Sequence, residues 1–227
     1  MKIAFYGDSL TEGIPGASYF KLLRAQLPEH CLLNYGKINA TVSTLSRQIQ
    51  HYHQIEPTDI SFLWIGVNDI LIRRSRLFST VRRYWAKDQA EFCRHYQVLL
   101  DILSPQTQRL IAAPPLLIGE DVHNPWNETL AEYATIICDL TSNIPNAEFL
   151  DLRAVFLAEL KNRIPSPFIC GPAFQSVLDA LVLRTPAQID AASAQRGLHL
   201  TLEGVHLNTT GAQLVADIFR KALDSSQ

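Results

Sequence analysis

Three side chains in this sequence are of the types that nucleophilic catalysis needs. Ser9 lies in the segment Gly-Asp-Ser-Leu at residues 7–10, and His206 follows Glu203 by three positions near the other end of the 227-residue chain. A serine hydroxyl is a weak nucleophile until a base removes its proton, and a neutral imidazole, which titrates at about pH 6.5, is suited to that task. A carboxylate can orient the imidazole and stabilise its charged form. The residues therefore predict acyl transfer, with Ser9 as nucleophile, His206 as base and Glu203 as orienting acid.

An acyl-transfer site also needs hydrogen-bond donors, because the tetrahedral intermediate carries an oxyanion. The sequence offers the backbone N–H groups of Ser9 and Gly36 and the side-chain amide of Asn68. Loss of one such donor typically lowers turnover by about 100- to 1000-fold. We expect these three groups to form the oxyanion hole.

Short apolar runs precede most of these residues and predict buried strands. Runs that are apolar on both faces suit strands covered by helices on either side. They span Lys2–Tyr6, Leu32–Tyr35, Ile60–Ile65, Arg109–Ala112 and Glu148–Leu152. Segments with helical spacing of apolar residues alternate with them, which favours a parallel sheet between helical layers. Sites in such sheets form at the carboxyl ends of the strands, where Ser9, Gly36 and Asn68 are expected to meet.

Residues 161–200 depart from this alternation. They contain four prolines and two segments of helical character. One segment is Pro186–Gln195, and the other has an apolar face made of Phe174, Val177, Leu178 and Leu181. We expect a helical excursion whose apolar face packs on the sheet sandwich. The alternative is that it walls the acyl pocket.

Four blocks occur in order along the chain: Gly-Asp-Ser-Leu at 7–10, Gly36, Gly-x-Asn-Asp at 66–69 and acid-x-x-His at 203–206. Together they resemble the GDSL (SGNH) esterase and lipase family, and the resemblance covers nearly the whole chain. It implies a three-layer α/β/α sandwich of flavodoxin type, with a five-stranded parallel sheet in the order 2-1-3-4-5. It also implies hydrolysis of carboxylic esters. Residue by residue, Ser9 matches the nucleophile and one oxyanion donor, Gly36 and Asn68 the other donors, and His206 the base.

Glu203 departs from the family pattern, in which this acid is usually aspartate. The extra methylene moves the carboxylate by roughly a C–C bond length, and positioning errors of that size can slow catalysis. Either Glu203 acts through a relaxed loop, or a backbone carbonyl orients His206 and a Ser-His dyad operates; we favour Glu203. The departure also leaves open a binding protein that keeps the fold without turnover. For an enzyme, acetylated carbohydrates, lysophospholipids and acyl thioesters are the candidate substrates.

A basic run follows the predicted third strand. Six of the residues from 73 to 87 are lysine or arginine, although the net charge of the chain is only -2. Such a run usually forms a solvated face. The alternative is recognition of an anionic part of the substrate, and for that role we single out Arg73 and Arg74.

Composition limits the remaining classes. With 47% apolar and 19% charged residues, the chain is not of the disordered type, and its slightly negative charge disfavours nucleic-acid binding. No apolar run reaches about 18 residues, so we expect no integral membrane segment. The four cysteines include no C-x-x-C pair, and no glycine-rich phosphate loop follows the first strand. We expect a single cytoplasmic domain over residues 1–227 that uses no metal or cofactor and acts on a small-molecule ester.

Overall fold

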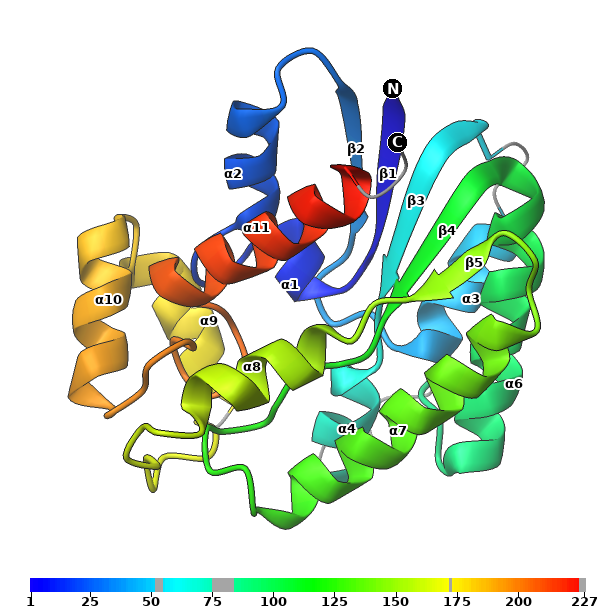
Figure 1. The fold of residues 1–227 in the computed structure, drawn as a ribbon. Coiled ribbons are helices and arrows are strands. Elements are labelled where there is room, and N and C mark those ends of the chain that lie inside the picture. Colours follow the sequence, from blue (N-terminus) through cyan, green and yellow to red (C-terminus); the bar gives the residue numbers. More distant parts are fainter. Residues whose placement is uncertain (52–54, 75–83, 172, 225–227) are drawn as a thin grey trace.

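The computed structural model describes residues 1–51, 55–74, 84–171 and 173–224 (Figure 1). At its centre is a parallel sheet of five strands in the order β2-β1-β3-β4-β5, which confirms the predicted topology. The strands are β1 (Lys2–Gly7), β2 (Cys31–Gly36), β3 (Thr58–Trp64), β4 (Thr107–Ala113) and β5 (Ala147–Phe149). Because all of them run in one direction, their carboxyl ends meet at one edge of the sheet.

Helices cover both faces of the sheet, as predicted. On one face, α6 (Gln89–Leu103) packs against both α3 (Val42–His51) and α7 (Pro125–Ser142). On the other face α2 (Tyr19–Gln26) packs against α11 (Thr209–Asp224) (Figure 1). The other described helices are α1 (Ser9–Glu12), α4 (Val67–Arg74), α8 (Leu152–Leu160), α9 (Ala173–Val182), α10 (Pro186–Gln195) and the 3₁₀ turn η1 (Ser104–Gln106).

The last strand is shorter than the sequence predicted. The apolar run suggested a strand through Leu152, whereas β5 ends at Phe149 and Leu152 is the first residue of α8. Asp151 is the reason, because its carboxylate accepts the Ala154 N–H at 2.9 Å and caps the helix. A capping aspartate inside an apolar run therefore ended the strand earlier than hydrophobicity indicated.

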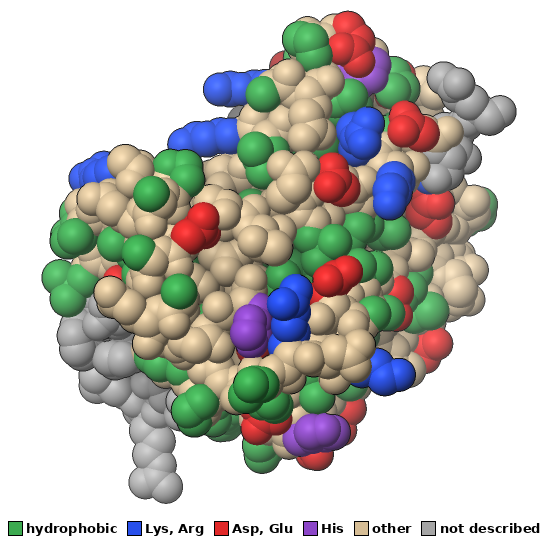
Figure 2. Space-filling view, turned by 60° about the vertical axis from the view of Figure 1, so that its left-hand side comes forward, with side chains coloured by type: hydrophobic (Ala, Val, Ile, Leu, Met, Phe, Trp, Pro, Cys, Tyr) green, Lys and Arg blue, Asp and Glu red, His purple; other side chains and the backbone are tan. Residues whose placement is uncertain are grey.

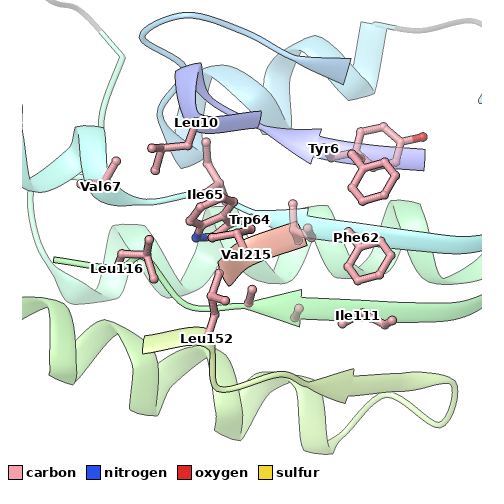
Figure 3. Close-up of a cluster of buried hydrophobic side chains, with 14 of the residues drawn as sticks. Tyr6, Leu10, Phe62, Trp64, Ile65, Val67, Ile111, Leu116, Leu152 and Val215 are labelled. Carbon is pink, nitrogen blue, oxygen red and sulfur yellow. The ribbon is translucent and has the colours of Figure 1, made fainter. Parts of the chain in front are cut away.

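The core lies on both faces of the strands, as continuous apolar runs require. Phe5 of β1 stacks on Phe62 of β3 at 4.8 Å between ring centroids, and Phe219 of α11 lies 4.6 Å from Phe62. Figure 3 shows the buried cluster reaching the carboxyl ends of the strands, where Leu10 and Val67 are the sequence neighbours of Ser9 and Asn68. Ser9 and Asn68 are thus flanked by buried apolar side chains that pack in the core.

The segment after α8 contains α9 and α10, and two of the four residues assigned to the apolar face of α9 are exposed. Leu178 and Leu181 are 46% and 59% exposed, whereas Asp179 between them is buried. Asp179 forms a bidentate ion pair with Arg196, with N–O distances of 2.8 and 3.0 Å. A buried carboxylate with a fitted guanidinium therefore orients this helix. The side chains of Phe174 and Val177 lie outside the part of the chain that the structure describes.

The side of the molecule that carries α10 in Figure 1 has charges of both signs on its surface. Figure 2 turns this side of the molecule forward and shows lysine and arginine side chains interspersed with acidic and apolar ones.

Among the helices that the structure describes, none combines the length and apolarity needed to cross a lipid bilayer.

Candidate active site

Ser9, His206 and Glu203 form one hydrogen-bonded chain at the carboxyl edge of the sheet. Ser9 Oγ lies 2.8 Å from His206 Nε2, and His206 Nδ1 is in hydrogen-bond contact with Glu203 Oε1. A carboxylate only accepts, so Nδ1 carries the proton and Nε2 is left to accept from the serine hydroxyl. Exposed fractions are 5% for Ser9, 8% for His206 and 0% for Glu203. The geometry is that of a nucleophile, a base and an orienting acid.

The strand-to-helix turn after β1 presents Ser9. Asp8 caps α1 by accepting the Leu10 N–H at 2.9 Å, which places Ser9 at the first helical position. Gly7 allows the turn to be this tight, because a Cβ there would lie 2.3 Å from Thr11 Oγ1 and 2.5 Å from the Trp64 carbonyl oxygen. In this turn, Gly7 permits close packing, Asp8 caps the helix and Ser9 presents its hydroxyl group.

A closed loop between α10 and α11 presents His206 and Glu203. The Leu202 N–H donates to the His206 carbonyl at 2.6 Å, and the Asn208 N–H donates to the Leu200 carbonyl at 3.1 Å. Within the loop, the His206 N–H also donates to Glu203 Oε2 at 3.2 Å. Gly204 has φ +90°, and a Cβ there would lie 2.0 Å from the Ile169 carbonyl oxygen. This loop accommodates the longer glutamate, so Glu203 contacts the imidazole directly.

Asn68 is held at the start of α4, beside the site. Its Nδ2 donates to the Ala40 carbonyl at 2.8 Å, which orients the amide. An amide nitrogen has two hydrogens, and one is enough for this bond. Asn68 is 8% exposed. The arrangement suits the predicted donor role.

The backbone N–H of Gly36, unlike the amide of Asn68, has no second hydrogen to offer an oxyanion. It donates to Asn34 Oδ1 at 2.8 Å, so an oxyanion would have to replace that bond. In the same loop Asn39 adopts φ +62°, a left-handed conformation that is uncommon for residues other than glycine and is found at functional sites. The sequence analysis did not single out Asn39, although asparagine is among the residues that tolerate this conformation.

Buried carboxylates shape the electrostatics around the base. Burial lowers the pKa of His206, but the charge and hydrogen bond of Glu203 raise it more, with further contributions from Asp8 and Asp179, so that the pKa lies above its ordinary value. Burial raises the pKa of Asp8 to about 6 and that of Asp69 to about 7. Asp69 accepts the N–H groups of Val42 at 3.0 Å and Ala86 at 2.8 Å. It therefore joins two loops beside Asn68 and has a structural role.

Arg73, predicted with Arg74 to bind substrate, contacts no triad residue in the part of the chain that the structure describes. One Arg73 nitrogen donates to the Lys87 carbonyl at 2.9 Å and to the Tyr133 hydroxyl at 3.3 Å, toward α6 and α7. The side chain of Arg74 lies outside the described residues. Within the described part of the chain, no three His, Cys, Asp or Glu side chains are grouped so that they could hold a metal ion.

Comparison with known proteins identifies the family and the fold of the chain. The model of the GDSL-like lipase/acylhydrolase family matches residues 5–214. Among solved structures, an acetylxylan esterase from Geobacillus stearothermophilus, Axe2, is 20% identical with a TM-score of 0.71, covering 97% of this chain and 92% of its own. The acetyl xylan esterase AlAXEase is 22% identical with a TM-score of 0.68, covering 98% and 100%. LAE5, an alpha/beta hydrolase from the metagenome of Lake Arreo in Spain, is 20% identical with a TM-score of 0.70, covering 98% and 94%. No curated protein matches the sequence.

Proposed function

Because the chain belongs to the GDSL-like lipase/acylhydrolase family, we propose that it is a serine hydrolase that cleaves carboxylic esters through an acyl-enzyme on Ser9. The observation that carries the proposal is the continuous chain from Ser9 Oγ through His206 to Glu203. A hydroxyl, an imidazole and a carboxylate in this order are the arrangement that activates serine for acyl transfer.

The reaction has two halves. Ser9 Oγ attacks the ester carbonyl carbon while His206 Nε2 accepts the hydroxyl proton. The same nitrogen then gives the proton to the departing alkoxide, and the acyl group stays on Ser9. In the second half, water attacks the acyl-enzyme in the same way, and the carboxylic acid is released from Ser9. Throughout, Glu203 keeps Nδ1 protonated and stabilises the imidazolium.

The Ser9 N–H and the Asn68 amide are the proposed oxyanion donors. Asn68 is already oriented by Ala40, so little reorganisation accompanies the reaction. Gly36 joins them only after its bond to Asn34 is exchanged. The contact between Glu203 and His206 supports a triad over a Ser-His dyad, and an enzyme over a binding protein without turnover.

We propose that the acyl group is short, with acetyl esters of carbohydrates as the substrate class. Two structures with the same fold are described as acetylxylan esterases. In this chain, the nucleophile and base are only 5% and 8% exposed, which favours a small acyl group at the serine.

The substrate proposal is tested with p-nitrophenyl esters of increasing chain length. We expect kcat/KM to be highest for the acetyl ester and to fall by at least about tenfold at the octanoyl ester, since an overlarge acyl chain costs one to a few kcal/mol. Acetylated xylo-oligosaccharides should release acetate, whereas lysophospholipids and acyl thioesters should be poor substrates. A preference for long chains would refute the substrate class and leave the ester hydrolase intact.

The activity should depend on the protonation of His206. Only neutral imidazole accepts the serine proton, and the pKa of His206 is raised above 6.5 because Glu203 outweighs the effect of burial. Activity is therefore lost as the pH falls through the raised pKa. We expect an acid limb in kcat/KM between pH 5 and 9 with its midpoint above about 6.5. A flat profile, or a midpoint below that value, would contradict the assignment of His206.

A further inference from the structure

Glu120 is a buried carboxylate that the ester-cleaving chemistry does not use. It lies in the loop between β4 and α7 and is 3% exposed. Its Oε2 accepts the His199 N–H at 2.7 Å. Its Oε1 accepts the N–H groups of Leu200 and Thr201, each at 2.8 Å, and the Thr201 hydroxyl at 2.7 Å. Four donors from one tripeptide thus converge on this side chain.

This convergence is an anion-binding arrangement within the protein. Successive backbone N–H groups that point to one place form a concave site for negative charge, and charge-assisted hydrogen bonds are about twice as strong as neutral ones. Here the anion comes from a residue 79 to 81 positions earlier in the chain. Glu120 therefore fixes the path of residues 199–201, directly before Leu202 and Glu203.

The neighbouring residue holds the other side of Glu203. The Gly119 N–H donates to the Gly204 carbonyl at 2.6 Å. The backbone at Gly204 packs closely on that at Gly119, since a Cβ on Gly204 would lie 3.3 Å from Gly119 Cα. Gly119 in turn packs on Ile169, because a Cβ on Gly119 would lie 2.7 Å from Ile169 Cα. The dipeptide 119–120 thus holds the loop on both sides of the orienting acid.

We propose that Glu120 is a positioning residue, which holds the loop so that Glu203 and His206 stay aligned with Ser9. The inference rests on the proposed ester hydrolase. Glu120 acts through Glu203 and has no contact with the reacting atoms.

The loop has other supports, so removing the charge of Glu120 should loosen it without unfolding the protein. Arg196, paired with Asp179, donates to the Leu202 carbonyl at 2.9 Å. Asn208 donates to Ser193 at 2.9 Å and to the His199 carbonyl at 3.0 Å. These bonds persist in Glu120→Gln. That variant keeps one oxygen for the three Oε1 donors and turns an NH₂ group toward the His199 N–H.

The test compares Glu120→Gln with Asp59→Asn. Asp59 also accepts a backbone N–H, that of Lys2 at 2.7 Å, but it lies at the amino end of β3, away from the site. We expect Glu120→Gln to lower kcat by about 100-fold, the cost of a misplacement on the order of 1 Å, with KM changed by less than about threefold. The acid limb should move to lower pH because Glu203 supports the imidazolium less well. Asp59→Asn should change none of these.

A second readout separates this inference from the proposed function. The ring signal of His206, identified by its loss in His206→Gln, is titrated by NMR in Ser9→Ala with and without Glu120→Gln. The charged groups that act on His206, namely Glu203, Asp8 and Asp179, are present in both proteins. We expect Glu120→Gln to lower the pKa of His206, and this holds even for a protein that cleaves no ester.

An unchanged titration together with a wild-type kcat in folded Glu120→Gln would overturn the inference. If Glu120→Gln does not fold, Thr201→Val decides, because it removes only the hydroxyl donor to Oε1. We expect it to lower kcat several-fold and to shift the acid limb in the same direction. A wild-type rate and limb in that variant would also overturn the inference.

Discussion

Ser9→Ala is expected to lower kcat for p-nitrophenyl acetate by on the order of 10⁴- to 10⁶-fold, as removal of a triad serine does. The hydroxyl oxygen forms the covalent bond to the acyl group, and alanine has no replacement for it. The fold should tolerate the change, because Asp8 rather than Ser9 caps α1. Initial rates and thermal unfolding of the two proteins, measured side by side, test this.

The chain offers a matched control for this substitution. Ser46 Oγ of α3 lies 3.1 Å from His95 Nδ1 of α6, a second serine–histidine contact. Ser46→Ala should leave kcat unchanged, since no ester chemistry is assigned to that pair. A reactive fluorophosphonate should label wild type and Ser46→Ala, but not Ser9→Ala. Activity that survives in Ser9→Ala, or labelling that persists there, would rule out Ser9 as the nucleophile.

Glu203→Gln is expected to lower kcat by about 10⁴-fold, the effect that loss of the acid has in a Ser-His-Asp triad. The amide cannot stabilise the imidazolium and can donate to Nδ1, which would leave the proton on the nitrogen that faces Ser9. Without the charge of Glu203, burial dominates and the pKa of His206 falls. The residual activity should therefore persist to lower pH than in the wild type. The kcat/KM profile between pH 5 and 9 measures both effects.

Glu203→Asp is the control that separates charge from length. It keeps the carboxylate but shortens the side chain by one methylene, so we expect a smaller loss of kcat than in Glu203→Gln and an acid limb that stays closer to that of the wild type. If Glu203→Gln instead keeps kcat within about tenfold, a Ser-His dyad operates, and the contact between Glu203 and His206 is structural.

The strands and the place of the triad could be predicted because they follow from local patterns. Continuous apolar runs mark buried parallel strands, and the connections after them bring Ser9 and Asn68 to one edge. The helix starts at Asp88 and Asn124 have the same local origin, since a capping residue acts within its own first turn. Where such local signals conflicted, as at Asp151 in an apolar run, the predicted boundary was wrong.

The remaining features depend on partners that are distant in the sequence. Leu178 and Leu181 have the spacing of a buried face, yet Asp179 is buried because Arg196 meets it. Gly36 fits the donor pattern, yet Asn34 accepts its N–H. Glu120 lies in no motif, and its role becomes visible only when residues 199–201 are placed around it. One amino-acid sequence by itself does not show which distant residues contact each other in the fold.

The distance along the chain between nucleophile and base has a consequence for synthesis. Ser9 and His206 are 197 residues apart, so a ribosome makes the serine well before the base. β1 with its serine, β2 and β3 are all synthesised before the loop that carries the base. The nascent protein therefore carries an unactivated hydroxyl until the last loop docks. The onset of the proposed ester hydrolysis would therefore report that the loop carrying His206 has docked beside Ser9.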